Sequence, residues 1–203
     1  MRQPSLARMI RISLVLLALA AGGGYGVRYW TFRWEHHFDP VIMAAAARYQ
    51  VDPALVKAVV WKESRFRADA RGAAGELGLM QLMDPAAQEW AEVEKVYPVP
   101  EPHLLDPTTN TMAGTWYLRK MLQRYAGTDN PLPYALADYN AGRGNVLKWA
   151  RGEAATNSES FVSRIGFPTT KAYIGQVISR REQYRDDFPV NSDALRSSPG
   201  GPR

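Results

Sequence analysis

A single glutamate stands out because of where it falls on a predicted helix. Val59, Val60 and Glu63 follow Val56 at offsets of three, four and seven, which places Glu63 on the apolar face near the C-terminal end of that helix. A carboxyl group on such a face loses hydration and meets the negative end of the helix dipole, and both effects raise its pKa. A carboxylic acid that is still protonated near neutral pH can donate a proton to the leaving oxygen of a glycosidic bond. The alternative is a surface glutamate paired with a neighbouring lysine or arginine.

A second carboxylate is harder to find. Most glycosidases use two carboxyl groups, one as an acid and the other as a base or nucleophile. Asp138 and Glu76 are the two side chains that could lie near Glu63, but neither has a neighbourhood that marks it as a base. A site with one carboxylate needs assistance from the substrate itself.

Two further motifs could shape a binding cleft. Residues 72–78 form a glycine-rich turn, which lets the backbone approach a ligand or adopt a positive φ, and it leads into Gly-Leu-Met-Gln at 78–81. Gln81 lies in an apolar run and needs hydrogen-bond partners if it is buried, which a sugar amide could supply. Residues 139–142 are Tyr-Asn-Ala-Gly, where the glycine taken alone would be an ordinary helix stop.

Taken in order, Glu-Ser at 63–64, Gly-Leu-Met-Gln, Tyr-Asn-Ala-Gly and a later tyrosine resemble the soluble-type lytic transglycosylases. That family has a goose-type-lysozyme-like fold and cleaves the glycan strands of peptidoglycan, and the resemblance covers residues 54–183. It implies that Glu63 is the catalytic residue. It also implies that six other residues bind the substrate or orient the acid: Ser64, Gln81, Met83, Tyr139, Asn140 and Tyr173. For Tyr173, a buried aromatic on a helix stripe is the competing interpretation.

The resemblance also implies a mechanism that consumes no water. Glu63 protonates the oxygen between N-acetylmuramic acid and N-acetylglucosamine, and the 2-acetamido group supports the developing cation. Glu63 then takes the proton of the muramoyl 6-hydroxyl, which closes a 1,6-anhydro ring. No metal and no cofactor are implied. The chain departs from the family at Gly72, where serine is common, and at residues 169–171, where Thr-Thr-Lys replaces Glu-Thr-Arg.

Two other functions stay open on the sequence. A hydrolytic, lysozyme-type muramidase needs the same acid, so the residues do not separate it from a lytic transglycosylase. A non-catalytic peptidoglycan-binding module of an envelope complex is the second alternative, and the joint presence of all the motif residues argues against it.

Composition excludes several classes of function. The formal charge of +5 and the pI near 9.5 invite a nucleic-acid-binding interpretation, but residues 1–34 carry five arginines and no acidic residue. The remainder holds 20 basic and 20 acidic side chains, so no basic stripe is left to follow phosphates. The chain has no cysteine, which excludes a disulfide framework, a thiol nucleophile and a lipid-modified cysteine.

The N-terminal stretch predicts export. Arginines at 8 and 11 precede an apolar run at 12–21, and residues 18–20 (Ala-Leu-Ala) offer a cleavage site. Against cleavage, the apolar stretch continues to residue 27 and is followed by aromatic residues typical of a membrane interface. As a helix it would rise roughly 24 Å, somewhat less than a hydrocarbon core of ~30 Å. We expect an inner-membrane anchor or a cleaved signal, with a buried helix as the third alternative. The catalytic domain would then face the periplasm of a bacterial cell envelope.

Helix signals dominate the rest of the chain. Asp-Pro pairs beginning at 39, 52, 84 and 106, and Asn-Pro at 130, place a capping side chain before a proline suited to a first helical turn. Together with the apolar spacing they predict helices at 40–50, 53–66, 85–92, 107–126, 131–140, 143–151 and 169–186. Prolines make 93–105 a predicted loop, and the polar stretch 151–163 is predicted to be a loop at the rim of the cleft.

These signals predict an all-α, lysozyme-like domain preceded by an N-terminal membrane-anchor or signal helix. The predicted boundaries are 1–34 for the anchor and juxtamembrane segment, 35–190 for the catalytic domain and 191–203 for a disordered tail. The expected partners are peptidoglycan glycan strands and the inner membrane, not nucleic acid. We expect a monomer.

Overall fold

The computed structural model describes residues 23–24, 29–30, 32–96 and 98–188. They belong to two compact units, Met1–Phe38 and Asp39–Arg203, which we describe separately. In the first unit, residues 32–36 are helical. No helix within the described ranges is long and apolar enough to cross a membrane. The predicted export run at 12–21 and the predicted tail at 191–203 lie outside those ranges.

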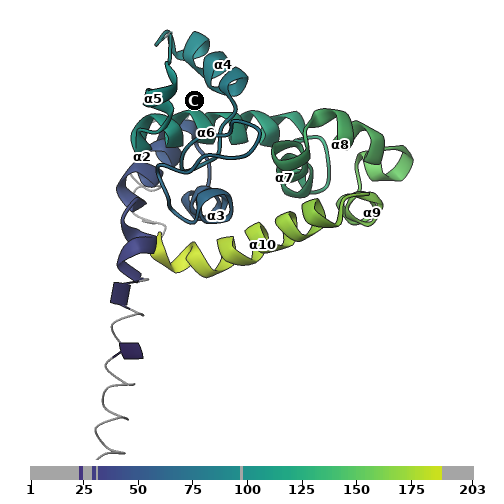
Figure 1. Cartoon of the computed structure of the whole chain (residues 1–203). Helices are drawn as coiled ribbons and strands as arrows, with labels where there is room; N and C mark the ends of the chain where they lie inside the picture. The colour runs from purple at the N-terminus through teal and green to yellow at the C-terminus, as the bar shows by residue number, and fades with distance from the viewer. Residues whose placement is uncertain (1–22, 25–28, 31, 97, 189–203) are drawn as a thin grey trace, which may run out of the picture. The chain divides into compact units, whose positions relative to one another are not determined.

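The second unit is built of helices (Figure 1). The α-helices are α2 (Asp39–Tyr49), α3 (Pro53–Ser64), α4 (Asp84–Glu94), α5 (Glu101–Leu104), α6 (Pro107–Arg124), α7 (Pro131–Ala141), α8 (Arg143–Trp149), α9 (Ser158–Arg164) and α10 (Pro168–Tyr184). Two 3₁₀ helices, η1 (Gly152–Ala155) and η2 (Arg185–Asp187), complete the unit. In the part of this unit that the structure describes, extended backbone pairing is limited to two isolated bridges in the turn between α3 and α4. The predicted all-α class is confirmed for this unit.

Packing around α3 and α6 holds the unit together. α3, which carries Glu63, packs against α10 and α2, and α6 packs against α2, α4 and α7 (Figure 1). Several aliphatic side chains in these helices and in the turn before α4 have no exposed surface: Ile42, Val59, Leu79, Leu118, Leu136 and Val177. Burying one such side chain contributes roughly 1.5–3 kcal/mol, so this core fixes the helices that border the site.

Asp52, Asp106 and Asn130 cap helices as predicted. Their side-chain oxygens accept hydrogen bonds from the backbone N–H groups of residues 54, 109 and 132. The prediction is wrong for Asp84, because Met83 is the N-cap residue of α4 and makes no side-chain cap bond. Asp84 instead lies in the first turn, where its negative charge faces the positive end of the helix.

Two segments that were predicted as loops contain short helices. α5 lies within 93–105, and η1 and most of α9 lie within 151–163. The loop prediction is wrong for 151–163 because Asn157 accepts a hydrogen bond from the Ser160 N–H and so caps α9. In addition, the Phe161 ring is fully buried and stacks on Tyr134 at a centroid distance of 4.0 Å. One buried aromatic in a short polar stretch is too weak a pattern to reveal a helix of seven residues.

α3 ends at Ser64, two residues before its predicted end. Arg65 and Phe66 adopt a left-handed backbone, with φ of 54° and 62°. Such a conformation costs roughly 1–3 kcal/mol for a residue other than glycine. Burial of the Phe66 ring, which is 1% exposed, offsets much of that cost. The chain therefore turns sharply just after Glu63, which leaves Glu63 in the last turn of its helix.

Candidate active site

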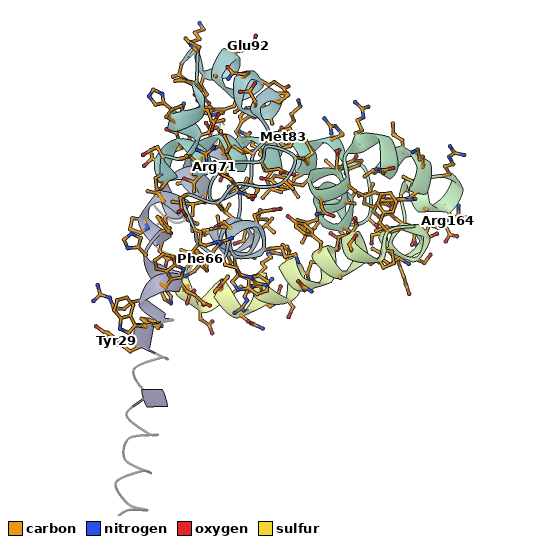
Figure 2. All side chains as sticks on the ribbon, in the orientation of Figure 1. Tyr29, Phe66, Arg71, Met83, Glu92 and Arg164 are labelled. Atoms are coloured by element: carbon orange, nitrogen blue, oxygen red, sulfur yellow. The ribbon has the colours of Figure 1, made fainter. Side chains whose placement is uncertain are left out.

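Glu63 opens into a cleft of about 290 Å³ that is bordered by the end of α3, the turn before α4 and the end of α7. The cleft is lined by Glu63, Gly72, Ala73, Glu76, Gln81, Met83, Tyr139 and Asn140. Five of the seven predicted site residues are thus brought together from distant parts of the chain. Met83, at the start of α4 (Figure 2), is 43% exposed and forms part of the rim.

Glu63 has a pKa raised from its ordinary value of 4.5 to about 7. Loss of hydration is the largest cause, and the negative charge of Glu76 acts in the same direction. The hydrogen bond from the Tyr173 hydroxyl to Glu63 Oε1, at 2.5 Å, and the positive charge of Lys62 lower the pKa. Burial dominates, so a large fraction of Glu63 is protonated near neutral pH. This is the state that a general acid requires.

Tyr173 and Ser64 do not line the cleft. Tyr173, in α10, is 2% exposed and acts on the cleft through its hydrogen bond to Glu63. Burial raises the pKa of Tyr173 well above 10, so its hydroxyl stays a neutral donor. Ser64 is 1% exposed, and its hydroxyl donates to the Val60 carbonyl oxygen at 3.1 Å. The structure therefore separates Ser64 from the other predicted binding residues, because a side chain buried in this way does not reach a ligand.

Gln81 uses its amide nitrogen within the protein. Nε2 donates to the carbonyl oxygens of Ala70 and Gly78, at 3.1 and 2.9 Å. The partners of this amide nitrogen are thus backbone carbonyl groups. Its Oε1 lies close to Gly72 at the edge of the cleft.

Tyr139 and Asn140 come from the last turn of α7. The Tyr139 hydroxyl donates to the Met80 carbonyl oxygen at 2.8 Å, which ties α7 to the turn before α4. Thr170 Oγ1 donates to Asn140 Oδ1 at 2.9 Å, so the Asn140 amide nitrogen is left to donate into the cleft. Sequence reasoning missed the contribution of Thr170. Its only signal is a spacing of three from Tyr173, which puts both side chains on one helix face.

Asp138, one of the two candidates for a second carboxylate, faces α6 instead of the cleft. It is 3% exposed, and its Oδ2 accepts hydrogen bonds from Arg124 and from the Tyr125 hydroxyl. Of the two candidates, only Glu76 lines the cleft.

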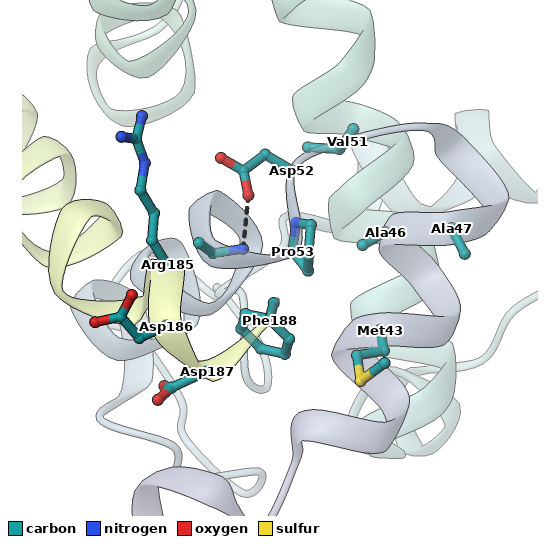
Figure 3. Close-up of a pocket in the computed structure, with 11 residues that line it drawn as sticks. Met43, Ala46, Ala47, Val51, Asp52, Pro53, Arg185, Asp186, Asp187 and Phe188 are labelled. Atoms are coloured by element: carbon teal, nitrogen blue, oxygen red, sulfur yellow. Dashed lines mark hydrogen bonds between the residues drawn. The ribbon is translucent and has the colours of Figure 1, made fainter. Parts of the chain in front are cut away.

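A larger hollow, of about 1140 Å³, lies at the opposite end of α3 (Figure 3). Met43 of α2, Asp52 and Phe188 are among its lining residues. Asp52 is already engaged there, because it accepts the hydrogen bond from the Ala54 N–H that Figure 3 draws and is paired with Arg181. Size alone does not make this hollow the reactive site, since the carboxyl group suited to acid catalysis lies in the smaller cleft.

Known proteins give an independent view of the chain. The family model described as "Transglycosylase SLT domain" matches residues 40–162. The soluble lytic murein transglycosylase of Salmonella typhimurium is 32% identical over 145 residues, which cover 69% of this chain and 21% of that protein. The membrane-bound lytic murein transglycosylase C of Pectobacterium atrosepticum is 33% identical over 125 residues, covering 56% of this chain and 33% of that protein. This chain thus spans about a fifth to a third of the length of these relatives.

Solved structures agree with the sequence likeness. An inactive mutant of the lytic transglycosylase Slt from Pseudomonas aeruginosa matches with a TM-score of 0.67 and 26% identity, over 73% of this chain and 24% of that chain. The 70-kDa soluble lytic transglycosylase of Escherichia coli matches with a TM-score of 0.65 and 26% identity, over 74% of this chain and 24% of that chain. Since the family model covers more than half of its residues, this chain belongs to the transglycosylase SLT domain family.

Proposed function

We propose that this chain is a peptidoglycan lytic transglycosylase, which cleaves the β-1,4 bond between N-acetylmuramic acid and N-acetylglucosamine and leaves a 1,6-anhydro end. The observation that carries the proposal is a half-buried glutamic acid with a pKa of about 7 that lines a cleft with Tyr139 and Asn140. Relatives from several bacteria are named lytic murein transglycosylases, which supports the same activity.

Glu63 acts first as an acid and then as a base in this proposal. Its protonated carboxyl group gives a proton to the leaving oxygen, the bond from that oxygen to C1 of the muramoyl residue breaks, and the 2-acetamido group supports the positive charge. The muramoyl 6-hydroxyl oxygen then bonds to C1, and its proton returns to Glu63. Glu63 is unchanged at the end and no water is consumed. Tyr173 holds the carboxyl group in place, and Asn140 donates to an oxygen of the bound sugar.

Replacing Glu63 tests the proposal directly. We expect Glu63→Gln to lower the rate at which muropeptides are released from purified sacculi by at least about a hundredfold. General acid–base catalysis contributes roughly 10²–10⁴-fold to the rate. In the parent, activity should fall as pH rises through about 7, since the acid must be protonated. Digests analysed by mass spectrometry should contain products one water lighter than reducing-end muropeptides. A matched control is Glu92→Gln, the same change at an exposed position on α4 (Figure 2), which should behave as the parent does.

A hydrolytic muramidase is the second candidate, and one observation favours it. Glu76 places another carboxylate in the cleft, where it could activate a water molecule. The same mass spectra decide between the two, because hydrolysis gives reducing ends instead of anhydro ends. If Glu63→Gln retains the parent's activity, Glu63 is not the acid and both proposed mechanisms fail. If the parent itself releases no product from sacculi, a non-catalytic peptidoglycan-binding module becomes the better description.

The cellular setting is also part of the proposal. We infer that residues 1–34 export the protein and anchor it in the inner membrane, that 35–190 form a monomeric catalytic domain at the periplasmic face, and that 191–203 are a disordered tail. The apolar run at 12–21 supports export, and a relative named as membrane-bound supports anchoring. Fractionation of cells tests this, with the protein expected in the inner membrane and with its N-terminal residues retained. Recovery from the cytosol would contradict it.

A further inference from the structure

Glu76 has no part in the mechanism above, although it shares the cleft with Glu63. It lies in a turn closed by hydrogen bonds from the Gly72 N–H to the Glu76 carbonyl oxygen, at 2.8 Å, and from the Gly75 N–H to the Gly72 carbonyl oxygen, at 3.3 Å. Its carboxylate bends back over this turn, where Oε2 accepts a hydrogen bond from the Ala74 N–H at 3.0 Å. The backbone and this bond together hold the carboxylate in one place.

Gly72 provides the space in which that carboxylate lies. A Cβ atom added at Gly72 would be 2.1 Å from Glu76 Oε2 and 2.8 Å from its Cδ, far inside contact distance. It would also be 3.0 Å from Gln81 Oε1. The Glu76 carboxylate therefore occupies the volume that a side chain at position 72 would fill. The family that this chain resembles often has a serine at position 72. Here position 72 is a glycine, and the carboxylate of Glu76, four residues later, fills the space that a serine side chain would take.

Two acceptor groups thus meet at this edge of the cleft. Gln81 Oε1 and the Glu76 carboxylate both lie beside Gly72, while the Gln81 amide nitrogen is turned away toward backbone carbonyl oxygens. Within the described residues, Glu76 Oε1 accepts no hydrogen bond. A saccharide in the cleft carries hydroxyl and amide N–H donors, and a carboxylate accepts such donors more strongly than a neutral oxygen does.

We propose that Glu76 is a substrate-binding residue whose carboxylate accepts a hydrogen bond from a hydroxyl or amide N–H group of the sugar bound beside Glu63. This inference rests on the proposed function, because it takes a glycan strand as the ligand. It assigns a binding role to the Glu76 side chain, where the sequence indicated only that the backbone of the 72–78 turn could approach a ligand.

The Glu76 charge has a second, measurable effect on Glu63. The groups that act on the pKa of Glu63 are Tyr173 of α10, Lys62 on its own helix and Glu76 of the turn, and the hydroxyl of Tyr139 in α7, which shares the cleft, stays neutral because burial raises its pKa well above 10. Since the Glu76 charge raises the pKa of Glu63, removing that charge lowers it. The loss of activity at alkaline pH should then begin at a lower pH.

Binding of chitotetraose to protein that carries Glu63→Gln, and so cannot cleave the ligand, tests the proposal. In Glu63→Gln protein, the affinity for chitotetraose should fall roughly tenfold or more when Glu76→Gln is added, because a hydrogen bond to a charged group is lost. Glutamine keeps the size of the side chain and an oxygen for the Ala74 N–H, so a purely structural role predicts unchanged affinity. Adding Glu92→Gln instead is the matched control and should leave the affinity as it was. With Glu63 intact, Glu76→Gln should raise KM with little change in kcat and shift the alkaline limb of the pH profile downward.

A double-mutant cycle on Gly72 tests the packing part of the inference. Gly72→Ala should weaken chitotetraose binding about as much as Glu76→Ala, because the added methyl group displaces the carboxylate. The double variant should be no worse than either single variant, since both changes remove the same interaction. Additive losses would contradict the proposed pairing of Gly72 with Glu76.

The remaining outcomes separate this inference from the proposed function. An unchanged affinity in Glu76→Gln overturns the inference, including the case in which only the pH profile moves. Loss of affinity only for strands that carry peptide stems also overturns it, because the carboxylate would then pair with an ammonium group. Absence of anhydro products with the parent enzyme, by contrast, counts against the proposed function alone. Binding of chitotetraose by the Glu63→Gln protein still decides the role of Glu76 in that case.

Discussion

Glu63 illustrates how a residue that suits catalysis weakens the fold that holds it. Its carboxyl group borders the cleft but is largely removed from water, so the fold must be stable enough to hold a poorly hydrated group that ionises near neutral pH. The same burial raises the pKa of Glu63. The positive charge of Lys62 lowers that pKa, but the loss of hydration has the larger effect.

We therefore predict that Glu63→Gln stabilises the protein at alkaline pH. A carboxyl group whose pKa rises from 4.5 to about 7 on folding contributes stability below pH 4.5 that is lost as pH rises through 7. The loss amounts to roughly 3 kcal/mol at about 1.4 kcal/mol per pKa unit. Urea unfolding should show the variant more stable than the parent at pH 8 by an amount of that order, with little difference at pH 4. An equal difference at both pH values would show that the gain does not come from ionisation.

The sequence was informative about single residues where a pattern reported their surroundings. The apolar spacing before Glu63 predicted its burial, and the motif at 139–142 predicted its neighbours. Ser64 follows Val56 at an offset of eight, so the same spacing agreed with its burial, and only the family motif placed it in the site. The spacing did not reveal the partners of Gln81, which are set by how the turn folds back on Ala70.

At the scale of elements, one buried network fixes α7 relative to α6. Asp138 of α7 accepts hydrogen bonds from Arg124, at the end of α6, and from Tyr125 just after it. The next residues of α7, Tyr139 and Asn140, line the cleft. The position of these two side chains therefore depends on a contact on the far side of their helix.

Replacing the Asp138 carboxylate should destabilise the domain. We expect Asp138→Asn to cost about 3 kcal/mol, because it removes one partner of a largely buried ion pair and leaves Arg124 without its counter-charge. Guanidinium chloride unfolding should show a lower midpoint with an unchanged m-value. The control Asp69→Asn, at an exposed position, should stay within about 0.5 kcal/mol of the parent. Equal midpoints for the two variants would show that the network contributes little.

Long helices with proline and capping signals were predictable, and short ones were not. α6 and α10 have strong periodic stripes and a proline in the first turn, and both were predicted to within two residues. α9 was missed because a single core contact, Phe161 on Tyr134, gives no periodic signal. Helices of this kind are held by tertiary packing rather than by their own sequence preference.

At the scale of the whole second unit, Lys57 connects the first and the last of its described elements. The side chain is fully buried in α3, and Nζ pairs with Asp39, at the start of α2, and with Asp187, in η2, at 2.8 Å each. It also lies 4.8 Å from the centre of the Tyr184 ring. The helix that carries Glu63 is thus joined to the first and last elements of the unit.

We predict that Lys57→Met destabilises the unit by about 3 kcal/mol. Methionine fills a similar volume, so the loss of stability comes mainly from Asp39 and Asp187, which lose the positive charge that they share. Changing Asp39 and Asp187 to asparagine in the same protein should recover part of the loss, and thermal unfolding at neutral pH measures both effects. If the triple variant is less stable than Lys57→Met alone, repulsion between the carboxylates is not the cause.

The contact between Lys57 and Asp187 also sets an order of events during synthesis. Asp187 is made after every residue that lines the cleft, and the two partners lie 130 positions apart in the chain. Until the ribosome has added Asp187, the ammonium group of Lys57 lacks its ion pair with that residue, so α3 is not yet held at that point. The proposed acid Glu63 would then lie on a firmly held helix only after every residue of its cleft has been made.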